Sequence, residues 1–250
     1  GDKGHALILR IQPGYGANVP HPDDPFTLEM FATEAADTAH RLRDLAWIWQ
    51  VGNEVNIRDE NLRWNPATSL YDGARWEPSP EEYAATYLAV RDAIHSITPE
   101  VGPGRQIVLM QPVSPGGATG ETGFEARYFD GYEFLYRQIR AIEDHSKIDG
   151  FALHGYAQPG GANFGVDGYM DSIREQIMII ESLGLGDRPI FVTEFNKHMP
   201  NADEAAIGAH FLVDAYDAMA QWNAGTGGGS FVDSSIPNAN IIGATWFVYN

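Results

Sequence analysis

The chain has 250 residues, no cysteine, and 34 Asp and Glu against 16 Lys and Arg, which gives a formal net charge of −18. Such an acidic surface repels phosphate backbones and anionic membranes, so neither nucleic acid nor a membrane surface is expected as a partner. The lack of cysteine excludes disulfides, thiolate zinc sites and cysteine nucleophiles, and no run of about 18 apolar residues predicts a membrane span.

Six short apolar runs bounded by turn residues are spaced along the chain, with helical patterns between them. Such alternation is typical of repeated βα units and a parallel sheet. The runs lack strict alternation of apolar and polar residues, which indicates strands buried on both faces. The first five end near Ile11, Val51, Val113, Tyr156 and Phe195, and the sixth is "NIIGATWFVY" near the end of the sequence.

Helices are predicted between these runs, and several have recognisable ends. Ser79 and Glu82 have the spacing of a capping box, in which each side chain accepts a hydrogen bond from the other residue's backbone N–H. Asn201 and Glu204 repeat that spacing, and Gly184 is placed to end a helix. The predicted helices cover residues 27–44, 79–94, 131–144, 169–184 and 201–219.

Long segments rich in glycine and polar residues lie next to the predicted strands, at residues 55–78, 114–125, 157–167 and 223–240. Loops that follow strands form the binding face of α/β barrels. There is no internal repeat and no linker between domains. The sequence therefore predicts one α/β domain over residues 1–250.

Polar side chains stand where four of the predicted strands end, and ligands bind at the carboxyl ends of strands in such sheets. They are Asn53 and Glu54, His154 and Tyr156, Glu194 and Asn196, and Trp246. Cleavage of a glycosidic bond uses two carboxyl groups, about 5 to 5.5 Å apart when the configuration is retained. Glu54 and Glu194 are the candidate pair, and Tyr156 or His154 is expected to donate a hydrogen bond that keeps one of them ionised.

Four short motifs, "VGNEVN", "LHGY", "FVTEFN" and "ATWF", resemble the retaining glycoside hydrolases of clan A, the barrel group that includes cellulases, β-mannanases and β-xylosidases. The resemblance implies a (β/α)8 TIM-type barrel without a cofactor, in which Glu54 is the acid/base and Glu194 the nucleophile. It places Asn53 near the sugar 2-hydroxyl, His154 and Tyr156 on strand six, and Trp246 as a sugar platform.

The same resemblance assigns the six readable βα units to strands three to eight. It predicts that units one and two are missing from this sequence, so that the barrel is reduced or the chain lacks an N-terminal part. The family takes an arginine from strand two to hold the nucleophile, and Arg10 is the candidate to replace it. Val55 stands where the family often has proline.

Other polar and aromatic residues have two interpretations. Gln111 and Asn196 are candidates for contact with substrate. Trp64, Tyr71 and Trp76 line either outer sugar subsites or the inside of a loop. Residues 21–25, "HPDDP", fit turn chemistry better than a metal site, and no metal is expected.

The expected function is hydrolysis of a β-linked oligo- or polysaccharide, and the alternative is a non-catalytic carbohydrate-binding or scaffold protein.

Overall fold

The computed structural model describes residues 6–97, 106–115, 128–157, 166–197, 205–225 and 241–246. The chain forms two compact units by its internal contacts, unit 1 at Gly1–Gly150 and unit 2 at Phe151–Asn250. The single domain expected over residues 1–250 stays a prediction. None of the helices in the described ranges is long and apolar enough to cross a membrane.

Unit 1 is built on three parallel strands in chain order. Strand β1 is Ile8–Ile11, β2 is Ile48–Val51 and β3 is Ile107–Met110. The register pairs Ile8 with Ile48 and Ile48 with Ile107. Every residue of β2 is buried, as the uninterrupted apolar run predicts for a strand covered on both faces.

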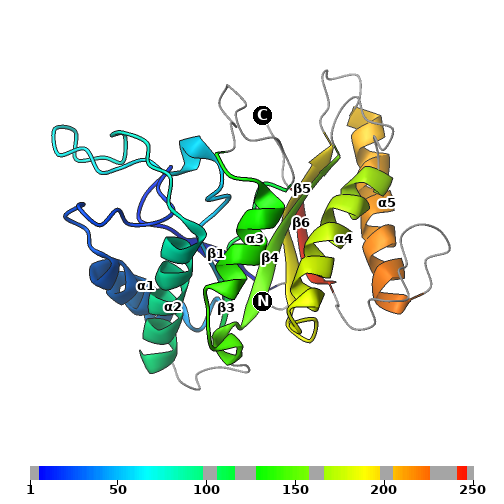
Figure 1. Cartoon of the computed structure of the whole chain (residues 1–250). Helices are drawn as coiled ribbons and strands as arrows, with labels where there is room; N and C mark the ends of the chain where they lie inside the picture. The colour runs from blue at the N-terminus through cyan, green and yellow to red at the C-terminus, as the bar shows by residue number, and fades with distance from the viewer. Residues whose placement is uncertain are drawn as a thin grey trace. The chain divides into compact units, whose positions relative to one another are not determined.

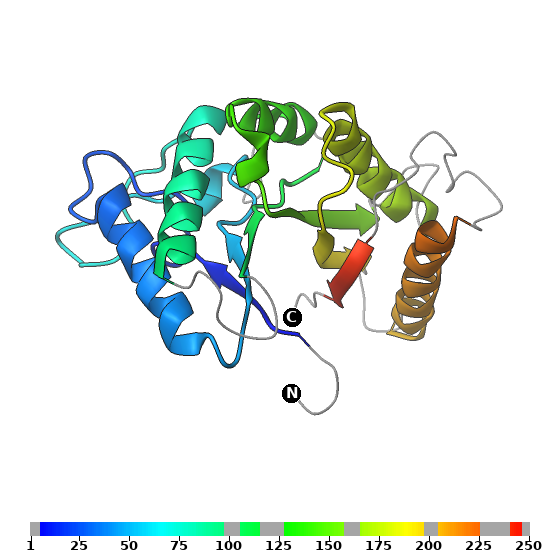
Figure 2. The same cartoon turned by 90° about the horizontal axis from the view of Figure 1, so that it is seen from below.

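Three helices and two short 3-10 turns complete unit 1. The helices are α1 at Leu28–Leu42, α2 at Pro80–Ile97 and α3 at Gly131–Arg140, and the 3-10 turns are Arg58–Glu60 and His145–Lys147. Helices α1 and α2 lie side by side (Figures 1 and 2). The capping box is confirmed: Ser79 N donates to Glu82 Oε2 at 2.7 Å and Glu82 N donates to Ser79 Oγ at 3.1 Å.

Unit 2 repeats the pattern with β4 at Gly150–Ala157, β5 at Ile190–Lys197 and β6 at Ile241–Trp246. β5 pairs in parallel with both β4 and β6. Helices α4 at Val166–Ser182 and α5 at Ala205–Ala224 pack against each other (Figure 2). Gly184 has a φ of 75° just beyond α4, as expected of a glycine that ends a helix. The predicted cap at Asn201 and Glu204 lies outside the described residues.

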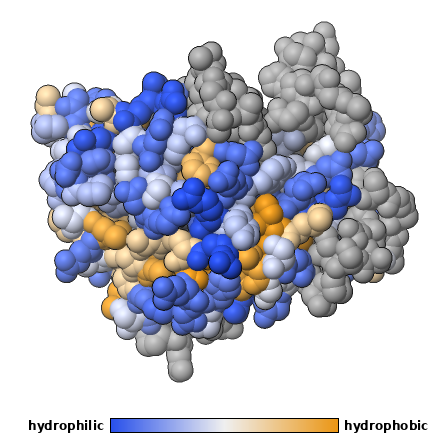
Figure 3. Space-filling view, viewed as in Figure 1, coloured by the Kyte–Doolittle hydropathy of each residue, from blue (hydrophilic) through white to orange (hydrophobic). Residues whose placement is uncertain are grey.

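The α/β class and six strands at the expected places are confirmed, whereas the eight-unit barrel stays a prediction. One boundary is wrong: the third strand ends at Met110 rather than near Val113. Beyond Met110 the backbone N–H groups of Gln111 and Ser114 donate to side chains, to Tyr83 Oη and Asn56 Oδ1, rather than to a neighbouring strand. Most of the described surface in Figure 3 is hydrophilic, in keeping with the acidic composition.

Candidate active site

The turn that follows β2 carries Glu54 in an unusual backbone conformation. Gly52 has a φ of 76° and Glu54 a φ of 41°, both in the left-handed region that non-glycine residues seldom adopt. Gly52 N donates to Ile11 O and Glu54 N donates to Pro112 O, each at 2.9 Å. The turn is therefore tied to the ends of both neighbouring strands, and the half-buried Glu54 is placed at their carboxyl edge.

Asn53 is buried in the same turn, and amide side chains hold it. Asn18 Nδ2 donates to Asn53 O at 2.6 Å, and Gln50 Nε2 donates to Gly52 O at 2.9 Å. Gln50 Nε2 also lies 3.4 Å from Asn53 Oδ1. The position of Asn53 beside Glu54 fits the expected role near a sugar hydroxyl, which stays a prediction.

Further amides that the sequence analysis missed continue this network. Asn56 exchanges two hydrogen bonds with the backbone of Ser114, at 3.0 and 2.9 Å. Asn61 Nδ2 donates to the carbonyl groups of Val55 and Ile57 at 2.7 and 2.8 Å. Asparagines in a polar loop follow no periodic pattern that would predict their contacts. The one available signal was that asparagines occur on both sides of Glu54 in the sequence.

In unit 2, Glu194 on β5 accepts a hydrogen bond from Tyr156 on β4. The distance from Tyr156 Oη to Glu194 Oε2 is 2.6 Å, and His154 Nδ1 lies 3.7 Å from the same oxygen. The Glu194 side chain is 15% exposed and that of His154 is fully buried. The donor expected from the sequence is therefore present: Glu194, in the second half of β5, accepts a hydrogen bond from the Tyr156 phenol, and the His154 imidazole lies close to the same oxygen.

An irregularity in the ladder brings His154 beside Glu194. The register pairs Leu153 with Val192 but His154 with Glu194, so Thr193 has no opposite residue. Regular pairing would place Thr193 beside His154 instead. A bulge of this kind redirects side chains and is frequent next to active sites. The apolar run that predicts β5 contains no signal for it.

The backbone of β4 is fixed from the helix side as well. Gln176 Nε2 on α4 donates to His154 O at 2.8 Å. A Cβ atom on Gly155 would lie 2.6 Å from Tyr169 Cε2 and 2.9 Å from Ile173 Cδ1. Only glycine allows α4 to approach β4 this closely between the two residues that face Glu194.

The remaining expected site residues have different surroundings. Asn196 pairs with Tyr156 and Trp246 pairs with Phe195 in the ladders, and the side chains of Asn196 and Trp246 lie outside the described residues.

In unit 1, Arg10 lines a cavity of about 400 Å³ together with Gln12 and Glu34. Gln111 is fully buried, and its amide contacts Val55 and Gln138 rather than an open surface.

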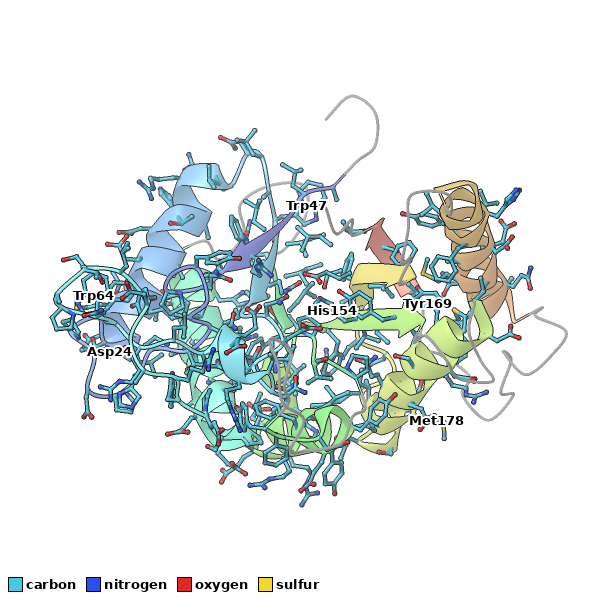
Figure 4. All side chains as sticks on the ribbon, turned by 90° about the horizontal axis from the view of Figure 1, so that it is seen from above. Asp24, Trp47, Trp64, His154, Tyr169 and Met178 are labelled. Carbon is cyan, nitrogen blue, oxygen red and sulfur yellow. The ribbon has the colours of Figure 1, made fainter. Side chains whose placement is uncertain are left out.

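An apolar pocket of about 300 Å³ lies in the loops of unit 1. Trp64 and Tyr71 meet edge to face, with ring centroids 5.4 Å apart. Trp64 N donates to the buried Asp24 at 3.3 Å, and the two residues lie together in Figure 4. Burial, followed by the charge of Asp24, raises the pKa of Tyr71 to about 12. The walls are Pro13, Pro25, Phe26, Met30, Trp64 and Tyr71.

Within the described ranges, no three His, Asp or Glu side chains are grouped to hold a metal ion. His21 Nδ1 lies 3.9 Å from Asp23 Oδ2 and accepts from Asp23 N at 3.1 Å. Asp24 N donates to His21 O at 2.9 Å. These contacts are those of a turn, as expected for "HPDDP".

Solved structures of glycoside hydrolases have the same fold as this chain. A glucosidase from Croceicoccus marinus matches with a TM-score of 0.59 and 14% identity, over 98% of this chain and 42% of its own. The chain has a glycoside hydrolase fold. It spans less than half the length of that glucosidase. No protein-family model matches the sequence, and no curated protein does either.

Two glucanases of glycoside hydrolase family 128 match across 98% of the chain, each at 17% identity. One is an endo-β-1,3-glucanase from Sorangium cellulosum, with a TM-score of 0.52 over 70% of its length. The other is a curdlan-specific exo-β-1,3-glucanase from Blastomyces gilchristii in complex with glucose, with a TM-score of 0.56 over 74% of its length. At such low identity the likeness concerns the fold.

Proposed function

We propose that the chain is a retaining β-glycoside hydrolase of the clan A type that acts on a β-linked glucan or a related oligo- or polysaccharide. Glu194 is the nucleophile and Glu54 the general acid/base. The hydrogen bond from Tyr156 to Glu194 at 2.6 Å is the observation that carries this assignment. A phenol that donates to a carboxylate at a strand's carboxyl end stabilises the ionised form that a nucleophile needs.

The reaction proceeds in two displacements. Glu194 attacks the anomeric carbon while Glu54 gives its proton to the departing glycosidic oxygen, so that the bond to the leaving group breaks as the glycosyl–Glu194 ester forms. Glu54, now a carboxylate, takes a proton from water. The resulting hydroxide attacks the anomeric carbon and releases Glu194, and both carboxyl groups return to their starting states.

The remaining residues have supporting roles in this proposal. Asn53, beside Glu54, bonds the sugar 2-hydroxyl, where interactions strengthen as the transition state forms. His154 keeps Glu194 in place together with Tyr156. Trp246, at the end of β6, supplies an apolar face for a sugar ring. Arg10 and Asn196 are the remaining candidates for substrate contact.

The proteins with the same fold guide the choice of the first substrates to test. Two of them are named as β-1,3-glucanases, so β-1,3-glucan is the first substrate to test, followed by β-1,4-glucan, xylan and mannan. An acidic surface does not disfavour these neutral polymers, whereas it disfavours nucleic acid.

Release of reducing sugar tests the proposal. The chain is incubated with each polymer beside its Glu194→Gln and Glu54→Gln variants, which keep the side-chain shape and remove the acid–base and nucleophilic groups. We expect release by the parent and a loss of at least about a thousandfold in Glu194→Gln. Sugar binding by all three proteins with no release by any would instead support the non-catalytic carbohydrate-binding alternative.

A further inference from the structure

Glu54 is held in a conformation that it would not adopt by itself. Its φ of 41° lies in the left-handed region, where the side chain of an L-residue crowds the backbone. Such a conformation persists only where the surrounding structure fixes it. Since φ sets the direction in which the Cα–Cβ bond leaves the chain, whatever fixes this angle sets where the Glu54 side chain starts and so the region that its carboxyl group can reach.

Hydrogen bonds hold the backbone on both sides of the Glu54 Cα atom. Glu54 N donates to Pro112 O at 2.9 Å, and Ile57 N donates to Glu54 O at 2.8 Å. The next N–H, that of Val55, donates to Gln111 Oε1 at 2.9 Å. The peptide group between Glu54 and Val55 is therefore bonded at both its oxygen and its nitrogen, and rotating it would break both bonds.

Gln111 is the one side chain in this set, and it is fixed in turn. Its Nε2 donates to Oε1 of Gln138 on α3 at 3.0 Å, and its backbone N donates to the Tyr83 hydroxyl at 2.5 Å. All three side chains are fully buried. A buried amide cannot turn without leaving its partners unsatisfied, which is unfavourable in a dry interior.

We infer that Gln111, oriented by Gln138, is a positioning residue that aims the Glu54 carboxyl group at the glycosidic oxygen. This inference rests on the proposed function. It replaces the expected contact of Gln111 with substrate, because a fully buried side chain has no surface to offer a sugar. Misplacing an acid by about 1 Å is enough to lower a rate by about a hundredfold.

Gln106 provides a matched control at the other end of the same strand. It is 1% exposed, directly precedes β3, and accepts a hydrogen bond from Trp49 Nε1 at 2.6 Å. Gln106→Met and Gln111→Met therefore each remove a buried amide and leave one donor unpaired, and Gln111→Met also leaves Gln138 Oε1 without its donor. The two variants differ in whether that donor belongs to the turn that carries Glu54.

Gln111→Glu is the conservative variant. It keeps an oxygen for Val55 N–H, and Gln138 Nε2, which has no hydrogen-bond partner in the described part of the chain, can turn to donate to the other oxygen. It also gives a second way to test the inference if Gln111→Met does not fold.

The experiment measures kcat and KM on two β-glycosides, one with a sugar or alkyl leaving group, which needs an acid, and one with an activated aryl group, which does not. For Gln111→Met we expect kcat on the first substrate to fall about 10- to 100-fold with KM within about twofold. On the second substrate kcat/KM should change little, because it reports the first displacement alone and not the later step in which Glu54 acts as a base. Gln111→Glu should lie nearer the parent, and Gln106→Met close to it. Equal losses on both substrates, or a rise in KM alone, would overturn the inference.

Exchange of the Val55 amide hydrogen separates this inference from the proposed function. We expect faster exchange in Gln111→Met than in the parent and in Gln106→Met, whether or not the parent hydrolyses a glycoside. An inactive parent with this difference would contradict the function and leave the positioning of Glu54 by Gln111 supported. Unchanged exchange at Val55 would contradict the positioning itself.

Discussion

The hydroxyl of Tyr156 donates a hydrogen bond of 2.6 Å to Glu194 Oε2, across a ladder that a bulge shifts by one residue. The bond joins the two strands at the proposed nucleophile, three residues before β5 ends at Lys197. In the proposed mechanism the acceptor is a carboxylate, which makes the bond of the stronger, charge-assisted kind.

Replacing Tyr156 by Phe should lower kcat/KM about 10- to 100-fold, since a hydrogen bond to a charged group contributes about 1.5 to 3 kcal/mol. Steady-state kinetics on an aryl β-glycoside measure this. Tyr216→Phe is the control, because its hydroxyl donates to Ala244 O at 3.3 Å instead. Equal rates for Tyr156→Phe and the parent would remove Tyr156 from the site.

Azide should distinguish the roles of the two glutamates. In Glu54→Ala the glycosyl–Glu194 ester still forms from an activated aryl β-glycoside, and azide attacks it without a base, which gives a β-glycosyl azide. In Glu194→Ala azide attacks the substrate directly and gives the α-anomer. Proton NMR of the product reads the configuration. The reverse pairing of variant and anomer would exchange the two assignments.

Asp149 should make unit 1 sensitive to acid. Its buried carboxylate accepts from Arg91 at 3.1 Å, from Val108 N at 3.1 Å and from His95 Nε2 at 2.6 Å. Burial acts to raise the pKa of Asp149, but His95 and Arg91 outweigh it and hold the pKa below its ordinary value. The folded state therefore gains stability from this group above about pH 4 and loses it as the pH falls further.

Asp149→Asn should lower the free energy of unfolding by about 3 kcal/mol at pH 7, because it breaks a buried ionic network. The difference from the parent should shrink below about pH 4. Urea unfolding at pH 7 and pH 3.5 measures both. Asp144→Asn, at the exposed residue just before the 3-10 turn His145–Lys147, should have a smaller effect. Equal stability of Asp149→Asn and the parent at pH 7 would contradict the account.

The apolar pocket at Trp64 and Tyr71 should matter for long substrates only. If the pocket is an outer sugar subsite, Trp64→Ala should raise KM several-fold on a β-glucan polymer, because the stacking of a sugar ring on the indole is lost. KM on a short aryl glycoside should not change. Leu70→Ala, at a 61% exposed residue of the same loop, is the control. An unchanged KM on the polymer would favour plain loop packing for Trp64.

The sequence was sufficient for the strands, the helices and the candidate carboxylates because those features have a local signal. Ser79 and Glu82 cap α2 as their spacing predicts, and Gly184 follows α4 in the left-handed conformation. The apolar runs locate both strand ends that carry Glu54 and Glu194. Tyr156 and His154 were both expected as possible donors, and Tyr156 is the one that bonds to Glu194.

Features that depend on contacts between distant segments were not predictable in the same way. The left-handed conformation of Glu54 depends on Pro112 and Gln111, which lie more than fifty positions further along the chain. The end of β3 at Met110 also depends on distant residues, because Tyr83 accepts the backbone N–H of Gln111. The pairing of His154 with Glu194 requires a bulge, and nothing in the alternation of residues along β5 indicates it.

Covalent trapping tests the central claim most directly. The chain is incubated with a 2-deoxy-2-fluoro β-glucoside that carries an activated leaving group, which slows hydrolysis of the glycosyl–enzyme, and its peptides are then analysed by mass spectrometry. We predict one added fluorosugar on Glu194, in the peptide that contains "FVTEFN", and none in Glu194→Gln. Turnover of β-glycosides without a label on Glu194, or with the label on another carboxylate, would contradict the proposed mechanism.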